Sequence, residues 1–391
     1  MRLLLLTPAE ISRDVRARRA VAAALARGHE VVAACGRISG EAPVPLEGVR
    51  VARAGRPGRA HRLWGVAPTA GRRRGRTLRD LRGLLRLGRL LPRTAGLVRA
   101  AGPLGPADVV HANDLDTLPA GSLLARRWGA RLVYDAHELY SEFEAPAPPL
   151  TRRLTLALER ALAGRADAVV TVSDGIADEL VERLGLATRP SVVVNAPERD
   201  ERPLHRFDVG PLRAVYQGRL GPGRALDDLL TAARAEDVEL SLRIPLVDPA
   251  SLRASIAARG LDGNVRVLDP VPPERVLDAL AEFEVGVLFD RPQSRNSELS
   301  FPNKLFEYLM AGLAVVAPRL ESLGPLLEDE RVGVTYEPGR PDRLAAALAR
   351  LAADRELLLE LRGRARELAL TRLNAEAAAG TLLAAWGQRA D

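Results

Sequence analysis

Residues 297–317 read SELSFPNKLFEYLMAGLAVVA and join a charged helix start to a short apolar strand. Pro302 suits the first position of a helix, where no backbone N–H is needed. From Leu305 onward apolar side chains recur at helical spacing, and Gly312 is suited to end the helix. The run AVVAP at 314–318 is typical of a buried strand. This order of elements predicts half of a parallel βαβ unit.

The same alternation of apolar runs and helical patterns continues on both sides of this stretch. Strands are predicted at 3–6, 30–35, 108–111, 131–137, 166–173 and 191–197, and then at 212–220, 240–245, 265–271 and 285–290. Helices are predicted at 14–27, 226–235 and 273–281, with only helices after residue 318. The fold class is therefore α/β, with two doubly wound Rossmann-like domains facing a cleft.

A chain of 391 residues is too long for one ordinary core, which favours two domains. We predict an N-terminal domain at 1–198, a polar linker at 199–211, a C-terminal domain at 212–375, and a last helix at 376–391 that packs back on the first domain. Ligands bind beyond the carboxyl ends of the strands in such sheets. The cleft between the domains is therefore the expected working site.

The composition limits where the protein works. Its single cysteine, Cys35, excludes a disulfide framework and favours a reducing compartment. No run approaches the about 18 apolar residues of a membrane-spanning helix, and RLLLL at 2–6 is too short for a signal sequence. We expect a cytoplasmic protein, either in solution or in peripheral contact with the inner membrane surface.

Lys304 and Glu307 lie one turn apart at the start of the predicted helix. Free N–H groups and the helix dipole attract anions there, and Lys304 adds a charge that suits phosphate. Glu307 can accept both hydroxyl hydrogen bonds of a ribose. The alternative is a surface ion pair worth about 0.3 kcal/mol. These two residues alone leave both interpretations open.

A glycine-rich segment, GRLGPGR at 218–224, stands between a predicted strand and a predicted helix. Its glycines let the backbone approach a ligand closely, and Arg219 and Arg224 offer forked donors to phosphate oxygens. The segment is neither a P-loop nor the G-x-G-x-x-G fingerprint. A plain glycine-rich connection is the alternative.

Together, this segment and FPNKLFEYLMAGLAVVA at 301–317 resemble the retaining glycosyltransferases of family 4, which have the two-domain GT-B fold. VVHANDLDTLPAG at 109–121, LVYDAHELYSE at 132–142 and ADAVVTVSDGI at 166–176 are similar to signatures of that family's acceptor domain. The resemblance spans nearly the whole chain. It implies transfer of a sugar, in polysaccharide or secondary-metabolite biosynthesis, from a UDP, GDP or dTDP sugar. The implied acceptor is a small molecule, a lipid-linked glycan or a polysaccharide.

The resemblance also implies which residues bind the donor. Arg219 and Lys304 match the diphosphate clamp, with Arg224 at the position of the family's usual lysine. Glu307 matches the second glutamate of the E-x7-E segment, which holds the ribose, and Asn303 lies in the same motif. We expect transfer with retention of anomeric configuration and no metal or other cofactor, because cations and a helix N-terminus can stabilise the leaving diphosphate.

On the acceptor side, His137 matches the family histidine near the reacting sugar, and Glu138 either orients His137 or caps the turn. The sequence departs from the family pattern at two places. The first glutamate of E-x7-E falls on Leu299, with Glu298 one residue early as a candidate substitute. The stretch 7–19 has no glycine, although the family has a glycine-rich loop there.

The sequence also contains residues that are typical of other sites and functions. Asp114 and Asp116 form a D-x-D, the manganese motif of the other large glycosyltransferase fold, but a second sheet domain argues against that fold. His111 and His137 lack a third metal ligand at recognisable spacing, and His111 is expected to be a hydrogen-bonded core residue. Ser173 lacks the G-x-S-x-G elbow of hydrolases. A nucleotide-sugar epimerase of the same fold and a non-catalytic accessory partner remain as alternatives.

A basic segment, RRRGRTLRDLRGLLRLGRLLPR at 72–93, contains nine arginines and a single acid, Asp80, in a chain whose net charge is +7. Its arginines recur at steps of three and four, which predicts one amphipathic helix with a stripe formed by Arg79, Arg82, Arg86, Arg89 and Arg93. Either the leucines pack on the sheet and the arginines are solvated, or the segment docks on an anionic membrane or a phosphorylated acceptor. Nucleic acid is disfavoured because no aromatic residue interleaves the stripe.

Overall fold

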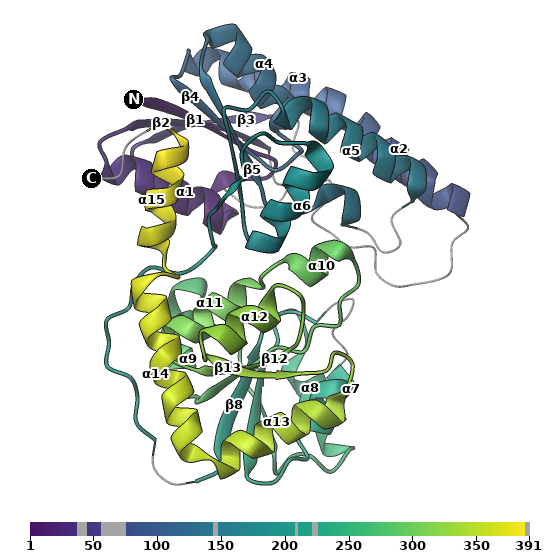
Figure 1. The fold of residues 1–391 in the computed structure, drawn as a ribbon, viewed down its shortest axis with the longest axis vertical. Helices are drawn as coiled ribbons and strands as arrows, with labels where there is room; N and C mark the ends of the chain where they lie inside the picture. The colour runs from purple at the N-terminus through teal and green to yellow at the C-terminus, as the bar shows by residue number, and fades with distance from the viewer. Residues whose placement is uncertain (37–44, 56–75, 144–147, 208–209, 221–225, 388–391) are drawn as a thin grey trace. The chain divides into compact units, whose positions relative to one another are not determined.

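The computed structural model describes residues 1–36, 45–55, 76–143, 148–207, 210–220 and 226–387. The chain divides into two compact α/β units (Figure 1). The first unit comprises Met1–Val194, Ser294–Ser297 and Ala378–Asp391, and the second comprises Asn195–Gln293 and Glu298–Ala377. The predicted fold class of two parallel-sheet, Rossmann-like units is confirmed.

The described residues of the first unit form a seven-stranded sheet in the order β3-β2-β1-β4-β5-β6-β7, in which neighbouring strands are parallel. Its strands are β1 (Arg2–Thr7), β2 (Glu30–Gly36), β3 (Val49–Ala54), β4 (Val109–Asn113), β5 (Arg131–Ala136), β6 (Ala168–Thr171) and β7 (Ser191–Val192). The edge strand β3 was not predicted, and the strand expected at 191–197 is only two residues long.

Helices cover both faces of this sheet. They are α1 (Val15–Ala26), α2 (Arg76–Gly88), α3 (Leu90–Ala101), α4 (Leu118–Trp128), α5 (Pro149–Ala163), α6 (Asp174–Leu184) and α15 (Ala375–Ala385). In Figure 1, α1 and α15 lie on one side of the sheet, and α3, α4 and α5 lie on the other. Leu382, Leu383 and Trp386 join the same core cluster as the strands. The end of the chain therefore belongs to the first unit.

The basic segment forms two helices, so the prediction of one continuous helix is wrong. Helix α2 ends at Gly88, and α3 begins at Leu90. Arg93 then lies on α3, where its Nη1 pairs with Asp116 Oδ2 at 3.0 Å. Residues 72–75 and the side chains of Arg79 and Arg82 lie outside what the structure describes.

The second unit has a six-stranded parallel sheet among its described residues, in the order β10-β9-β8-β11-β12-β13. The strands are β8 (Leu212–Gln217), β9 (Val238–Arg243), β10 (Val265–Val267), β11 (Val285–Val287), β12 (Ala314–Pro318) and β13 (Gly333–Tyr336). The expectation of helices alone after residue 318 is wrong, because β13 adds an edge strand. A Cβ on Gly333 would lie 2.0 Å from the carbonyl oxygen of Val315, so this close strand pairing requires glycine.

The helices of the second unit are α7 (Leu226–Ala232), α8 (Pro249–Ala257), α9 (Val276–Leu280), α11 (Asn303–Met310), α12 (Leu323–Asp329), α13 (Pro341–Ala353) and α14 (Arg355–Thr371). The two longest of them, α13 and α14, come after β12. Helix α10 (Arg295–Leu299) crosses the boundary between the two units in the chain. Pro302 is the N-cap of α11 rather than its first residue, because its ψ of 135° is extended. Gly312 follows α11 with a φ of 71°, as a helix-ending glycine does.

Candidate functional site

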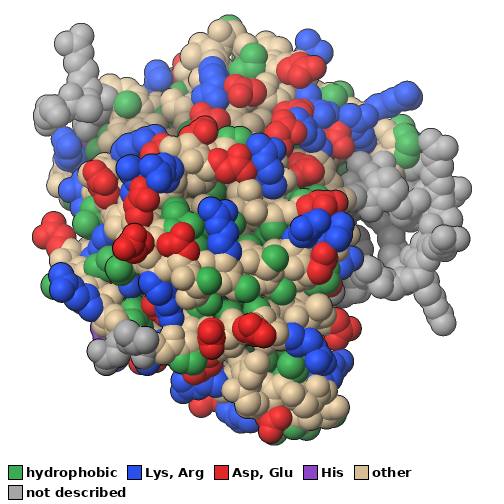
Figure 2. Space-filling view, turned by 60° about the horizontal axis from the view of Figure 1, so that its bottom comes forward, with side chains coloured by type: hydrophobic (Ala, Val, Ile, Leu, Met, Phe, Trp, Pro, Cys, Tyr) green, Lys and Arg blue, Asp and Glu red, His purple; other side chains and the backbone are tan. Residues whose placement is uncertain are grey.

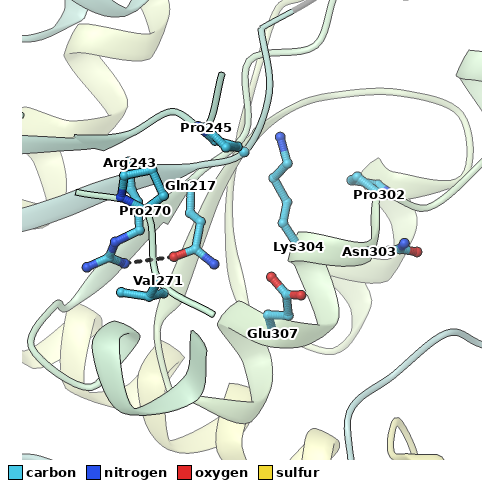
Figure 3. A pocket seen from close by; sticks show the side chains of 10 residues that line it. Gln217, Arg243, Pro245, Pro270, Val271, Pro302, Asn303, Lys304 and Glu307 are labelled. Carbon is cyan, nitrogen blue, oxygen red and sulfur yellow. Dashed lines mark hydrogen bonds between the residues drawn. The ribbon is translucent and has the colours of Figure 1, made fainter. Parts of the chain in front are cut away.

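A cavity of about 320 Å³ opens in the second unit where strands β8 and β9 end and α11 begins (Figure 3). Parallel sheets bind ligands at this edge because the carboxyl ends of the strands and the helix N-termini meet there. The cavity is lined by Gln217, Gly218, Arg243, Pro245, Pro270, Val271, Pro302, Asn303, Lys304 and Glu307. Three of the predicted donor-binding residues, Asn303, Lys304 and Glu307, are therefore brought together.

Lys304 is a buried cation at the edge of this cavity, with 9% of its surface exposed. Its Nζ donates to Tyr216 Oη at 3.2 Å and lies 4.3 Å from the centre of the tyrosine ring. Tyr216 in turn donates to the carbonyl oxygen of Arg219 at 2.7 Å. These contacts tie the first turn of α11 to the loop after β8.

Gly218 brings the loop backbone close to that cation. Its φ of 140° is in the region that favours glycine, and a Cβ there would lie 3.1 Å from Lys304 Nζ. Lys304 is also the only lysine among the 57 Lys and Arg residues of the chain. In a sequence that otherwise uses arginine throughout, this single exception was a signal that sequence reasoning did not use.

Glu307 projects into the same cavity one helical turn beyond Lys304 (Figure 3). The carboxylate and the ammonium group therefore face the space from one side of α11. The first backbone N–H groups of α11 follow Pro302, which also lines the cavity. A bound anion at this point would meet the ammonium group of Lys304 and the positive end of the helix dipole together.

Arg243 and Gln217 line the cavity and were not predicted. Arg243 ends β9 and is 6% exposed. Its Nη1 donates to Gln217 Oε1 at 2.7 Å, and its Nε donates to the Asp269 carbonyl oxygen at 3.3 Å. Burial lowers the pKa of Arg243, and the charge of Glu282 opposes this shift. The sequence signal that could have identified Arg243 is its position near the end of the predicted strand that begins LSLR at 240–243.

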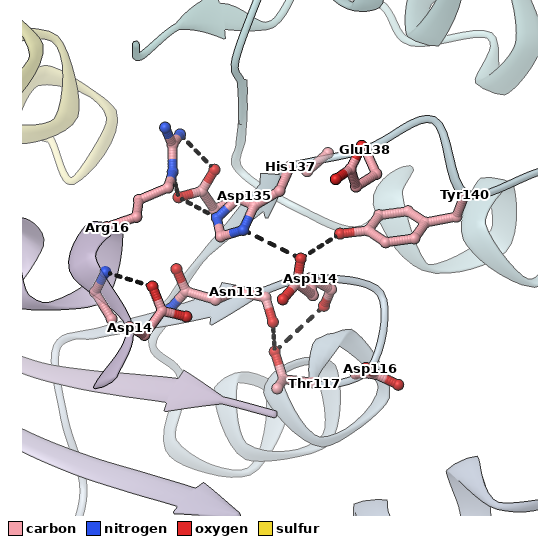
Figure 4. A network of polar contacts seen from close by, with 12 residues as sticks. Asp14, Arg16, Asn113, Asp114, Asp116, Thr117, Asp135, His137, Glu138 and Tyr140 are labelled. Atoms are coloured by element: carbon pink, nitrogen blue, oxygen red, sulfur yellow. Dashed lines mark hydrogen bonds and ion pairs between the residues drawn. The ribbon is translucent and has the colours of Figure 1, made fainter. Parts of the chain in front are cut away.

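In the first unit, a buried polar network surrounds Asp135 at the end of β5 (Figure 4). Arg16 binds both carboxylate oxygens, with Nε–Oδ2 at 2.8 Å and Nη2–Oδ1 at 2.7 Å. His137 Nε2 lies 3.2 Å from Oδ2, and His111 Nε2 lies 3.4 Å from the same atom. Burial opposes ionisation of Asp135, but Arg16 and His137 outweigh it and hold the pKa of Asp135 well below its usual range.

His137 is held between two carboxylates. Its Nδ1 lies 3.1 Å from Asp114 Oδ1, which also accepts a 2.6 Å hydrogen bond from Tyr140. Burial disfavours the charged imidazole, but Asp114 and Asp135 raise the pKa of His137 to about 9. The ring is therefore an imidazolium at neutral pH. A hydrogen bond from it to a ligand would have to replace one of these two contacts.

His111 connects this network to the end of the chain. Trp386 Nε1 donates to His111 Nδ1 at 3.1 Å, and the two rings meet edge to face at 5.8 Å. Because Nδ1 accepts, the proton of a neutral His111 resides on Nε2, which faces Asp135. The prediction that His111 is a hydrogen-bonded core residue is confirmed.

Glu138 follows His137 and is bound by Asn296, a residue that sequence reasoning missed. Asn296 Nδ2 donates to Glu138 Oε2 at 2.5 Å, and Asn296 Oδ1 accepts from the Leu139 N–H at 2.7 Å. Asn296 is 7% exposed and lies in the four-residue segment that belongs to the first unit. No local pattern around residue 296 could have indicated partners so distant in sequence.

Comparison with known families covers both units. The sequence model of glycosyltransferase family 4 matches residues 15–200, and that of glycosyl transferases group 1 matches residues 212–354. The chain belongs to glycosyltransferase family 4. It also has the GT-B fold of that family, with two Rossmann-like units.

The relatives agree with this assignment. A D-inositol 3-phosphate glycosyltransferase of Geodermatophilus obscurus is 29% identical over 299 residues, which span 68% of this chain and 64% of the relative. The enzyme of the same name from Saccharomonospora viridis is 28% identical over 311 residues, with 70% and 69% covered. The first match thus spans less than two thirds of the relative's length.

Solved structures share the fold at low sequence identity. Sucrose-phosphate synthase from Thermosynechococcus elongatus superimposes with a TM-score of 0.71 at 16% identity, covering 99% of each chain. Anabaena HepE in complex with UDP gives a TM-score of 0.71 at 17% identity, with 99% of this chain and 100% of that chain covered.

The other donor-binding positions that the family resemblance implied lie outside the lining of the cavity or outside the described residues. Arg219 is exposed after β8, Glu298 is half-buried on α10, and neither is among the described residues that line the cavity. Leu299 is fully buried, so a carboxylate at that position would be buried with it. Arg224 lies outside the described residues.

The D-x-D pair of this chain is engaged by protein partners. Asp114 has a φ of 68° and binds Tyr140 and His137, whereas Asp116 is 1% exposed and pairs with Arg93. The two carboxylates therefore have separate partners within the first unit. Among the described residues, no group of three His, Cys, Asp or Glu side chains is placed to hold a metal ion.

Proposed function

We propose that this family 4 protein transfers a glycosyl group from a nucleotide-diphosphate sugar to an acceptor, with retention of anomeric configuration and without a metal ion. The observation that carries the proposal is the convergence of Lys304, Glu307 and the N-terminus of α11 on one cavity. The relatives named as glycosyltransferases and the HepE complexes with UDP and UDP-glucose support it.

The cavity offers a separate group for each part of a nucleotide. Lys304 and the first N–H groups of α11 suit the diphosphate, and Glu307 suits the two hydroxyls of a ribose. Pro245, Pro270 and Val271 supply apolar surface that suits the flat face of a base. Nucleotide-sized ligands occupy pockets of about 300–1,000 Å³, and the cavity of about 320 Å³ lies at the lower end of that range.

The same groups would support the transfer step. The bond between the anomeric carbon and the diphosphate oxygen breaks, and its electron pair leaves with the diphosphate. Lys304 and the helix N-terminus stabilise the charge that develops there. The acceptor oxygen forms the new bond on the face that the diphosphate leaves, which retains the configuration, and its proton passes to the departing phosphate oxygen. We expect no metal to be needed, because cations of the chain already meet this charge.

The first unit would contribute His137 and Glu138. We propose that His137 acts in the transfer step as a fixed imidazolium, because Asp114 and Asp135 hold it from both ring nitrogens. Glu138, held by Asn296, would keep the segment after β5 in place. The variant His137→Gln should therefore lower kcat much more than it lowers affinity for the nucleoside diphosphate.

The acceptor would be a small molecule, a lipid-linked glycan or a polysaccharide. The names of the curated relatives make D-inositol 3-phosphate the first soluble acceptor to test. The basic segment at 72–93 supports peripheral contact with an anionic membrane surface. None of the helices in the described part of the chain combines the length and apolar character needed to cross a bilayer.

One experiment tests these points together. UDP, GDP and dTDP sugars are each incubated with candidate acceptors, with and without a chelator, and the product's anomeric configuration is read by NMR. Retained configuration and chelator-resistant activity are expected. An inverted product or loss of activity with the chelator would contradict the proposed chemistry. Conversion of the sugar nucleotide to its epimer without an acceptor would instead identify an epimerase.

A further inference from the structure

Exposed leucines gather on one part of the first unit. Nine large apolar side chains are exposed among the described residues, and six of them are leucines on helices α2–α5. These six are between 42% and 78% exposed: Leu81, Leu85, Leu91, Leu123, Leu150 and Leu154. Single exposed leucines are ordinary, but several on neighbouring elements mark an interaction surface.

The four helices are neighbours in space. Helix α3 packs beside α4, α4 beside α5, and α2 against both α3 and α5. Figure 1 shows them together along one side of the first unit. Leu81, Leu85 and Leu91 are exposed, whereas Leu90 is buried, so only part of the apolar side chains of the basic segment pack within the unit.

The same helices are strongly basic. Helices α2–α5 and Arg89 between them contain 12 arginines and only two acids, Asp80 and Glu159. Glu159 is 1% exposed and accepts a hydrogen bond from Tyr134, so it adds little negative charge to the surface. By contrast, Lys and Arg side chains are interspersed with Asp and Glu on the face shown in Figure 2.

On α4 and α5, exposed arginines lie beside the exposed leucines. On α4, Arg126 and Arg127 follow Leu123 by three and four residues, and all three are exposed. On α5, the exposed Arg153 lies three residues after Leu150 and adjoins Leu154. Residues three and four apart share a helix face. Each face therefore combines apolar and cationic side chains.

We propose that this leucine–arginine surface, formed by the outer faces of α2–α5, docks on an anionic lipid membrane. Leucines can enter the boundary between headgroups and acyl chains, and arginines can remain at the lipid phosphates. A nucleic acid would leave the leucines without a partner, whereas a lipid surface satisfies both kinds of side chain. The inference goes beyond residues 72–93 and does not depend on the proposed transferase activity.

The test is co-sedimentation of the full-length protein with vesicles of phosphatidylcholine, with or without phosphatidylglycerol. One variant removes apolar groups (Leu81→Ser, Leu85→Ser and Leu91→Ser), and another removes charge (Arg126→Gln, Arg127→Gln and Arg153→Gln). The matched control is Leu246→Ser with Leu359→Ser, which removes two exposed leucines of the second unit. Because all these side chains are exposed, the variants should melt at the parent's temperature.

Binding is expected to anionic vesicles, to weaken as salt rises, and to be absent with phosphatidylcholine alone. Each arginine near such a surface is worth about fivefold in partitioning, so the charge variant should bind on the order of 100-fold more weakly. The control should bind like the parent. No binding at low salt, equal binding to uncharged vesicles, or equal loss in the control would each overturn the proposal. Nucleotide binding measured on the same samples tests the proposed function separately.

Discussion

Replacing Lys304 with methionine should weaken nucleoside diphosphate binding while leaving the second unit folded. Methionine keeps an apolar stem of similar length, but it removes the ammonium group that lies 3.2 Å from Tyr216 Oη at the cavity. A charge-assisted hydrogen bond to phosphate is worth about 1.5–3 kcal/mol, which corresponds to a rise in Kd of about 10- to 150-fold.

Arginine at this position should not restore the affinity, although it keeps the charge. The space around Nζ is already bounded by Tyr216 and by Gly218, where even a Cβ would lie 3.1 Å away. A planar guanidinium on a longer side chain would displace the loop after β8. The arginine variant should therefore bind nucleoside diphosphate more weakly than the parent.

Isothermal titration calorimetry with a nucleoside diphosphate and with the matching nucleoside measures both effects. The loss should appear for the diphosphate and be nearly absent for the nucleoside, which carries no phosphate. Arg319→Gln is a suitable control, because Arg319 is an exposed cation of the same unit that pairs with Glu328. Parent-like diphosphate affinity in the methionine variant would refute the assignment of Lys304 to the phosphates.

Four further outcomes are expected. Glu307→Gln should weaken binding of a ribonucleoside diphosphate several-fold and leave the 2′,3′-dideoxy analogue unaffected in calorimetry, because only the ribose offers a diol. Charged His137 contributes stability that is complete below about pH 6.5 and is lost as pH rises toward its raised pKa of about 9. In the parent protein, this loss lowers the free energy of unfolding by about 3 kcal/mol over that pH range. In urea titrations, His137→Gln should show a smaller fall over the same range. Burial raises the pKa of Glu159 to about 7, so its stabilising protonated form is lost as pH rises through 7, and Glu159→Gln should be more stable than the parent at pH 8 by thermal melting. Trp386→Phe removes the donor to His111 Nδ1 and should cost about 1–3 kcal/mol of stability in the same urea titrations, because a buried acceptor loses its partner.

The strands in the middle of both sheets could be predicted because parallel strands buried on both faces read as continuous apolar runs. Of the four edge strands, β7 and β10 were predicted at greater length than they have, whereas β3 and β13 were not predicted. In β3, VRVARA, the arginines interrupt the apolar run. In β13, GVTY is too short and too polar to stand out, and its first residue is a glycine. These two strands therefore lack the continuous apolar run that identified the others.

The donor cavity was only partly predictable for a related reason. Lys304 and Glu307 share one helix face, so local spacing was sufficient to pair them. Arg243 comes from a different strand, and only the fold brings it to the cavity. Asn296 contacts Leu139, 157 residues away in sequence, and Trp386 contacts His111, 275 residues away. Single-sequence patterns carry no information about such pairings.

The single lysine of the chain allows the most direct test of the central claim. Protein labelled with nitrogen-15 only in lysine has one backbone amide and one side-chain signal, both from Lys304 at the start of α11. We predict that a nucleoside diphosphate shifts both signals in a saturable manner, and that the corresponding nucleoside shifts them much less. Binding of the diphosphate in calorimetry with both Lys304 signals unchanged would contradict the proposed donor site.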